Sequence, residues 1–190
     1  MEKPRNYDNT QTYGEYEPLP PGAYECVVID VKETKSKNGK DMLNIYLDIA
    51  RGEYRDFFNK QYASDTRPEK KWPCIVYQLL LDNEGNCNKG LKTFISALKG
   101  SSPDFDENKV WGTQTSAYLR GKGVGGVFRR EQYRKDGNLR WSTKCMRFCS
   151  LSSVEDTPVP EDKLIEETTF QPTGGSWGDY DSNGRLPWDE

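Results

Sequence analysis

The sequence contains no histidine and no long apolar run, and both absences narrow the possible functions. Histidine is the commonest general base of enzymes and a common metal ligand, so Ser-His-Asp triads and most zinc hydrolase sites are excluded. No apolar run approaches the roughly 20 residues that a membrane span needs, and we expect no signal peptide before the body. We therefore expect a soluble, intracellular protein that is not an enzyme.

Apolar residues are scarce, at 34% of the chain, and they thin out towards both ends. Such a composition predicts that part of the chain does not join a core. We expect an irregular N-terminal arm over residues 1–21, one domain over residues 22–153 and a disordered tail over residues 154–190. The arm is either a disordered lead-in, which we favour, or a segment that packs beside a ligand groove.

The five cysteines are odd in number and irregular in spacing, which is typical of reduced thiols rather than a disulfide framework. A zinc site built from Cys74, Cys87, Cys145 and Cys149 is a weaker alternative, because the chain has no CxxC pair. We expect no metal and no cofactor, and we expect the cysteines, Cys26 included, to be small buried hydrophobes.

Charge is divided unevenly along the chain, although the net charge is only −3. Residues 19–153 carry 23 basic and 16 acidic groups, which gives +7, whereas residues 154–190 carry 2 basic and 10 acidic groups, which gives −8. A basic body favours a polyanionic partner. The acidic tail is also expected to fold back and compete for the basic surface.

The stretch from Gly22 to Phe58 predicts the start of a sheet. In residues 42–50, apolar residues alternate with polar ones, which is typical of a strand with one wet face. We expect strands over 24–34, 42–50 and 54–61. Asn38-Gly39 and Arg51-Gly52 are expected to form the turns between them.

Residues 73–80 fit either a short helix, which we favour, or a strand. Residues 88–98 predict an amphipathic helix capped by Asn88 and ended near Gly100. Residues 118–150 predict two strands joined at Lys135-Asp136-Gly137-Asn138. Five strands with a helix between the third and the fourth predict a mainly β fold of the OB type, a small partly open barrel that binds oligonucleotides.

Two further patterns offer little support for catalysis. Gly121-Lys122-Gly123-Val124-Gly125-Gly126 contains GxGxxG but leads into a strand, so we expect its glycines to allow close backbone approach. Acidic residues around Asp104 and Asp106 lie in loop-like sequence, which leaves a metal-dependent nuclease as a minor alternative.

Aromatic residues interleaved with basic ones carry the positive prediction. Single-stranded nucleic acid needs cations along its phosphates and flat rings that stack its bases. We expect Phe58 and Phe128 to lie in the core and Tyr46 to be the best stacking ring. The predicted nucleic-acid-binding residues are Tyr46, Arg51, Tyr54, Arg55, Phe57, Arg129, Arg130, Tyr133, Arg134, Arg140, Trp141, Lys144 and Arg147.

The body resembles phage-encoded proteins of the early replication and recombination region. The resemblance covers about residues 19–153 and lies in the Gly-x-Tyr opening at Gly22, the Gly-Glu turn at Gly52-Glu53 and the sequence Leu119-Arg120-Gly121-Lys122. Several of those proteins are single-stranded DNA-binding proteins of OB fold. The resemblance implies a protein that coats single-stranded DNA in the cytoplasm of an infected bacterial host, and it leaves oligomeric state open.

The tail resembles the acidic C-terminal tip with which bacterial single-stranded DNA-binding proteins dock into replication and repair partners. The matching residues are Leu186, Pro187 and Trp188, followed here by Asp189 and Glu190. The resemblance implies that this tip recruits a replication or recombination protein of phage or host.

A protein–protein adaptor built on the same barrel is the alternative function from another class.

Overall fold

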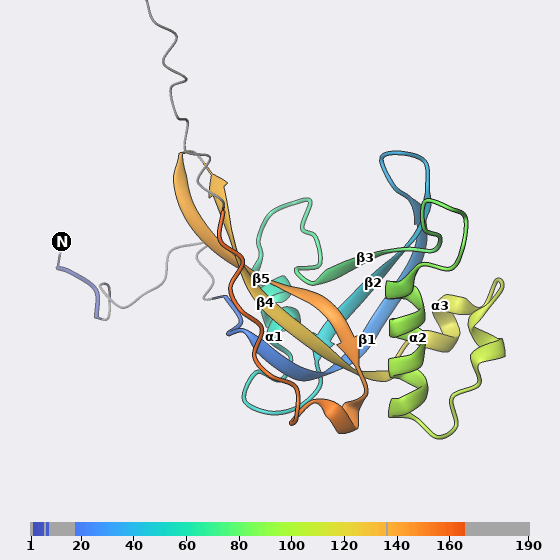
Figure 1. The fold of residues 1–190 in the computed structure, drawn as a ribbon. Coiled ribbons are helices and arrows are strands. Elements are labelled where there is room, and N and C mark those ends of the chain that lie inside the picture. Colours follow the sequence, from blue (N-terminus) through green and yellow to red (C-terminus); the bar gives the residue numbers. More distant parts are fainter. Residues whose placement is uncertain (1, 6, 8–17, 136, 166–190) are drawn as a thin grey trace, which may run out of the picture.

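The fold is mainly β and is built on one five-stranded antiparallel open sheet (Figure 1). The computed structural model describes residues 2–5, 7, 18–135 and 137–165. The strands lie in the order β3-β2-β1-β4-β5, so β3 and β5 form the two edges. The predicted mainly β class is confirmed.

Strands β1 (Gly22–Lys35) and β2 (Asp41–Ile49) form the first hairpin, as predicted. Gly39 has φ 75 in the turn, a conformation that favours glycine. Leu43, Ile45, Leu47 and Ile49 are buried on one face of β2. The other face of β2 carries polar groups and the Tyr46 ring, because successive side chains of a strand point to opposite faces.

The predicted third strand over 54–61 is wrong, since helix α1 (Phe57–Ser64) begins within this segment. The Asp48 carboxylate, at the end of β2, accepts hydrogen bonds from the backbone N–H groups of Phe58 and Asn59 at 2.9 and 3.1 Å. These bonds satisfy amide groups at the start of α1 that have no partner inside the helix. A cap from another element thus stabilises a helix despite the aromatic content of the segment.

The third strand is β3 (Ile75–Leu79), where a short helix was expected, so that prediction is also wrong. Ile75 pairs with Tyr46 and Tyr77 pairs with Asn44 in an antiparallel register with β2. Pairing with β2 supplies hydrogen bonds that a helix of this length would lack at both ends. β-branched Ile75 and Val76 also favour the strand.

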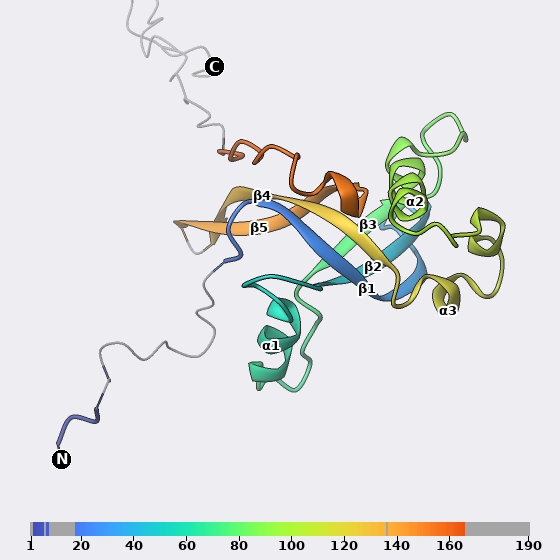
Figure 2. The ribbon, with the colours of Figure 1, turned by 90° about the horizontal axis from the view of Figure 1, so that it is seen from below.

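Strands β4 (Gly123–Lys135) and β5 (Asn138–Cys149) form the predicted second hairpin. The predicted close approach at the glycines is confirmed, since a Cβ on Gly126 would lie 2.9 Å from the Cys26 Sγ and one on Gly125 would lie 2.5 Å from the Cys149 Sγ. β4 pairs with β1 only as far as Phe128. Beyond this residue the hairpin extends away from β1 (Figure 2).

Helix α2 (Lys89–Ser101) confirms the predicted amphipathic helix. The Asn88 side chain accepts a hydrogen bond from the Gly90 N–H at 2.9 Å and so caps the helix. Leu91, Phe94, Ile95 and Leu98 are buried against the sheet. The remaining elements are η2 (Glu107–Val110), α3 (Thr115–Leu119) and η3 (Leu151–Ser153).

The core lies between the inner face of the sheet, α2 and the first turn of α1. Phe58 and Phe128 are buried there as expected, with ring centroids 6.0 Å apart. Cys26 and Cys74 are buried, Cys145 and Cys149 are half-buried and Cys87 is exposed; all five thiols are free. The expected burial therefore holds fully for two of the five cysteines.

Residues outside both predicted domain boundaries contact the body. Leu19, within the expected arm, is buried, and its carbonyl accepts a hydrogen bond from the Thr143 hydroxyl. Residues 151–165 run along the side of the sheet opposite α1 (Figure 2). Lys163 pairs with β4 in a parallel bridge opposite Glu131.

Candidate nucleic-acid interface

The outer face of strands β1, β2 and β3 carries an aromatic groove with a volume of about 540 Å³. Residues opposite each other in antiparallel strands share a face, so Asp30, Tyr46 and Ile75 lie in one row and Lys32, Asn44 and Tyr77 in the next. We call this surface the Tyr46 face. It also includes residues of α1 and of the loop that follows, namely Tyr62, Lys70, Lys71 and Trp72.

The loop between α1 and β3 is fixed to the sheet by Trp72. Its indole Nε1 donates a hydrogen bond to the Leu47 carbonyl at 2.8 Å, and the ring packs against the core. The Tyr62 ring lies 5.3 Å from the Trp72 ring, tilted by 42°. Trp72 is thus held with its polar atom paired while its edge still borders the groove.

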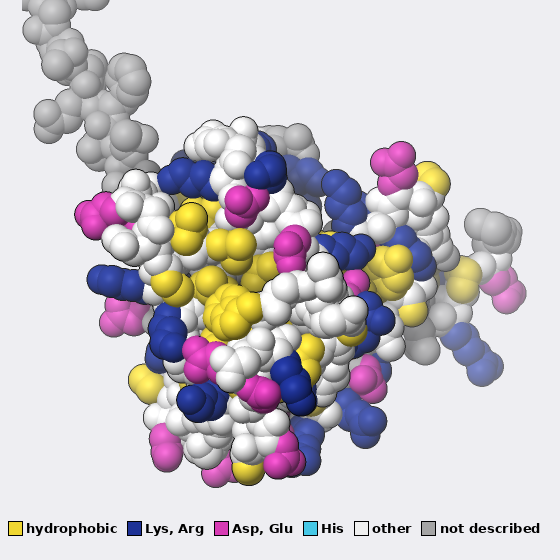
Figure 3. Space-filling model, turned by 90° about the vertical axis from the view of Figure 1, so that its right-hand side faces the viewer, with side chains coloured by type: hydrophobic (Ala, Val, Ile, Leu, Met, Phe, Trp, Pro, Cys, Tyr) yellow, Lys and Arg dark blue, Asp and Glu magenta, His cyan; other side chains and the backbone are white. Residues whose placement is uncertain are grey.

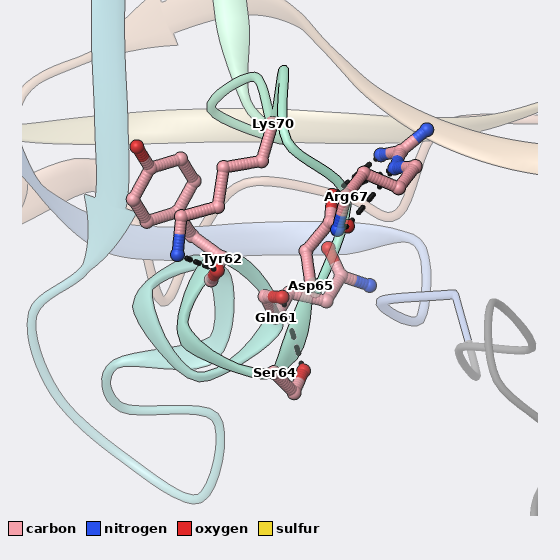
Figure 4. Close-up of polar contacts among 6 residues, drawn as sticks. All are labelled: Gln61, Tyr62, Ser64, Asp65, Arg67 and Lys70. Carbon is pink, nitrogen blue, oxygen red and sulfur yellow. Dashed lines mark hydrogen bonds and ion pairs between the residues drawn. The ribbon is translucent and has the colours of Figure 1, made fainter.

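Two lysines lie directly over rings of this face. The Lys32 Nζ lies 5.3 Å from the Tyr46 ring centroid, and the Lys70 Nζ lies 4.5 Å from the Tyr62 centroid. Figure 4 shows Lys70 reaching back to α1, where its Nζ donates to the Tyr62 carbonyl at 3.3 Å. Cation and ring are therefore presented together, as nucleic acid requires.

The same loop contains an ion pair close to the end of α1. The Arg67 guanidinium binds Asp65 (Figure 4), and this interaction lowers the pKa of Asp65 to about 2. Asp65, ionised at neutral pH as an aspartate ordinarily is, neutralises Arg67 locally. Of the remaining charged residues of the loop, Lys70 and Lys71 are positive and Glu69 is negative, so the loop keeps a net charge of +1.

The one carboxylate that lines the groove, Asp30, is paired. Burial alone would raise the pKa of Asp30, but hydrogen bonds from Arg120, Ser116 and the Val31 amide lower it. The Arg120 guanidinium lies 2.8 Å from the Asp30 Oδ1. Its charge is therefore compensated, and it does not cancel the lysines.

A second groove of about 530 Å³ lies between the two edges of the sheet. Residues 71–78 form one wall and residues 143–146, in β5, form the other. We call this groove the seam. A smaller cleft of about 240 Å³ adjoins it and is lined by Trp141 together with Leu19, Phe57 and Pro73.

The predicted residues from 51 to 57 lie away from these grooves, apart from Phe57 in the small cleft. Tyr54 and Phe57 pack against the core, with the Tyr54 ring 5.8 Å from Tyr24 and 6.2 Å from Phe57. Arg51 pairs with Glu25 and Arg55 with Asp56. The structure thus places these four residues in packing or in surface ion pairs.

The predicted residues of the last hairpin are divided between its two sides. One side presents Arg129, Tyr133, Arg140, Lys144 and Arg147, and the other presents Arg130, Arg134 and Trp141. The continuous basic track that the sequence suggested is therefore split.

Several of these cations are already paired. Glu131 binds Arg129 at 2.8 Å and Lys144 at 3.3 Å, and these bonds lower the pKa of Glu131. Arg130 binds Asp162, which raises the Arg130 pKa. Arg134, Arg140 and Arg147 have no ion-pair partner within the described ranges. Of the predicted set, Tyr46, Lys144, Trp141 and Phe57 line a groove.

Most residues of the Tyr46 face were not predicted, chiefly because the third strand was expected at residues 54–61 and lies at Ile75–Leu79. The residues that were not predicted are Lys32, Tyr62, Lys70, Lys71, Trp72 and Tyr77. One signal was present: the lysines and rings of 62–77 are interleaved like those of the last hairpin. The predicted partner-binding residues Leu186, Pro187, Trp188, Asp189 and Glu190 lie outside the described residues.

A separate apolar patch lies at the end of the molecule that carries α2 and α3. Figure 3 shows it surrounded by charged side chains of both signs. A groove of about 340 Å³ here is lined by Leu43, Leu80 and Val110, with Trp111 55% exposed.

Other site types find no support in the described part of the chain. No three Cys, Asp or Glu side chains gather there in a way that could hold a metal ion. Asp106, considered for a nuclease, accepts a hydrogen bond from the Asn108 N–H and caps η2. Among the helices of these residues, none is long and apolar enough to cross a membrane.

Residues 5–67 are similar to a family described as a protein of unknown function (DUF669). The match covers less than half of the chain and contains β1, β2 and α1, hence Tyr46 and Tyr62. No curated protein matches the chain. The resemblance to phage single-stranded DNA-binding proteins stays a prediction.

Proposed function

We propose that the protein binds single-stranded DNA without sequence preference, through the Tyr46 face. One observation carries the proposal: Lys32 lies over Tyr46 and Lys70 over Tyr62 on an open groove that also contains Trp72. Rings with adjacent cations stack bases of any identity and neutralise the neighbouring phosphates. Duplex DNA keeps its base faces stacked inside and cannot use the rings.

The strand order supports an OB-like barrel as the scaffold. The order β3-β2-β1-β4-β5 becomes a closed barrel when β3 and β5 meet, and the seam lies between those two edges. OB folds bind oligonucleotides on the face of their second and third strands. The Tyr46 face lies on β2 and β3, with β1 beside them.

The resemblance to phage-encoded proteins extends the proposal to a biological setting. A protein that coats single strands would protect DNA during phage replication or recombination in the host cytoplasm, with the C-terminal tip recruiting a replication protein. It would act without catalysis.

A fluorescence titration with oligo-dT tests the function, using the tryptophans as reporters. We expect sub-micromolar affinity at low salt, a log–log salt slope of about 0.7 per phosphate contact, and weaker binding of a duplex of equal length. Incubation of labelled DNA with Mg²⁺ or Mn²⁺ should leave it intact. Cleavage would instead favour the nuclease.

The apolar patch at Trp111 favours a second candidate, an adaptor that binds a protein. Exposed apolar patches ringed by polar groups are typical of interaction sites. An adaptor of this kind should bind no oligonucleotide. It should recover a replication protein in a pull-down, and Trp111→Ala should abolish that recovery. The Trp111→Ala variant therefore separates the two candidates.

A further inference from the structure

We propose that a bound single strand continues beyond the Tyr46 face, around the edge of β3, through the seam and on to Trp141. This inference rests on the proposed function and names the path of its ligand. The site would then be longer than the sheet face alone.

The grooves adjoin one another, because neighbouring grooves share lining residues. Lys71, Trp72, Ile75 and Tyr77 line both the groove on the Tyr46 face and the seam. Pro73 and Thr143 line both the seam and the small cleft at Trp141. A strand that enters at Tyr46 would therefore pass three adjoining hollows on its way to Trp141.

Charge along this path fits a polyanion. The residues that line the seam and the small cleft include Lys71 and Lys144 and no carboxylate. On the Tyr46 face the only lining carboxylate, Asp30, is paired with Arg120. Lys144 touches Glu131, but its side chain is 65% exposed and can turn towards a phosphate.

The walls of the seam also offer hydrogen bonds. β3 and β5 are edge strands of the described sheet, and an edge strand presents unpaired backbone N–H and C=O groups. Exposed base edges of a single strand carry donors and acceptors that can pair with such groups, whereas the bases of a duplex are already paired. Met146, 44% exposed, and Ile75 add apolar surface for base faces.

Oligonucleotide length tests the path, because a short strand fills only one part of it. Oligo-dT of about 4 and about 16 nucleotides spans the range of site sizes known for OB folds. We expect Tyr46→Ala to weaken binding of both lengths. We expect Lys144→Gln to lower the salt slope by about 0.7 for the longer strand only, and Trp141→Ala to weaken that strand on the order of tenfold.

Lys92→Gln, on α2 and away from the path, is the matched control and should change neither length. If Lys144→Gln and Trp141→Ala bind the longer strand like wild type while Tyr46→Ala is impaired, the path is wrong and the proposed function stands. If wild type binds neither length, both are overturned. Lys144 is exposed, so its variant should fold even where Trp141→Ala does not.

Discussion

The guanidinium carbon of Arg130 lies 4.3 Å from the centre of the Trp141 ring, and the same guanidinium binds the Asp162 carboxylate. Arg130 thus joins the far end of the proposed path to the beginning of the acidic tail. Lys163 holds that segment in place, because its N–H donates to the Arg130 carbonyl and its carbonyl accepts from the Gln132 N–H, both at 2.9 Å. Tail and DNA would compete for one cation.

Replacing Asp162 with asparagine should raise the affinity for oligo-dT at low salt. The change frees Arg130 for phosphate, and the gain should shrink as salt screens the competing charges. Titrations at two salt concentrations measure it. Glu161→Gln, a neighbouring exposed acid, is the control, and an equal gain in both variants would indicate a general charge effect instead.

Truncation should distinguish the described part of the tail from the rest. A chain ending at Ile165 should keep the melting temperature of the full chain and bind oligo-dT more tightly at low salt. A chain ending at Ser153 should melt lower, by about 2–4 °C per kcal/mol lost, because it lacks Val154 beside Gly125 and the Lys163 bridge. Equal melting temperatures would show that residues 154–165 contribute nothing to stability.

Replacing Tyr46 or Tyr77 with alanine should weaken single-strand binding by ~1–3 kcal/mol each, the value of one stacked base. Both rings border the groove, and Tyr77 is 63% exposed, so stability should change little. Circular dichroism melts check folding beside the titration. Trp111→Ala removes an exposed ring from another surface and should bind normally.

Asp48 should make stability depend on pH in an unusual direction for a carboxylate. Burial raises the pKa of Asp48 and outweighs the hydrogen bonds from the amides of Phe58, Ile49 and Asn59. Because the folded-state pKa is raised, the contribution of Asp48 to the free energy of unfolding is complete below the ordinary aspartate pKa of about 3.9. This contribution declines as the pH rises through the pKa of Asp48 in the folded state.

The variant Asp48→Asn should therefore lose more unfolding free energy, relative to wild type, below about pH 4 than at pH 7. At every pH it should be less stable, by about 1–3 kcal/mol, because its amide group cannot accept the Asn59 N–H. Denaturant melts at several pH values measure both. A gap that widens towards pH 7 would show that hydrogen bonding dominates and that the pKa is lowered.

Sequence patterns predicted an element of the fold correctly where residues close together in the sequence determine that element. The turn at Gly39, the cap at Asn88 and the alternation in β2 each depend on neighbouring residues, and each prediction is confirmed. Helix α1 depends instead on Asp48, ten residues before Phe58, and β3 depends on pairing with β2. Contacts between distant segments determine these elements, and residue pattern alone did not reveal them.

The sequence predicted the kind of site, namely aromatic rings beside cations, better than it predicted which residues form it. Tyr46 was found because strand alternation identifies a wet face, and Trp141 and Lys144 because rings and cations concentrate in the last hairpin. Alternation also divides the arginines of that hairpin between two sides, which a count of charges does not reveal. Trp72 enters the groove only because the loop after α1 folds onto Leu47.

Competition between single and double strands is the sharpest test of single-strand binding by this protein. Wild-type protein is titrated at low salt with fluorescent oligo-dT, and unlabelled single strand or duplex of equal length is then added as competitor. We expect the single strand to displace the probe at a much lower concentration than the duplex does. Equal displacement by the duplex, or no binding of the probe at all, would contradict the proposed function.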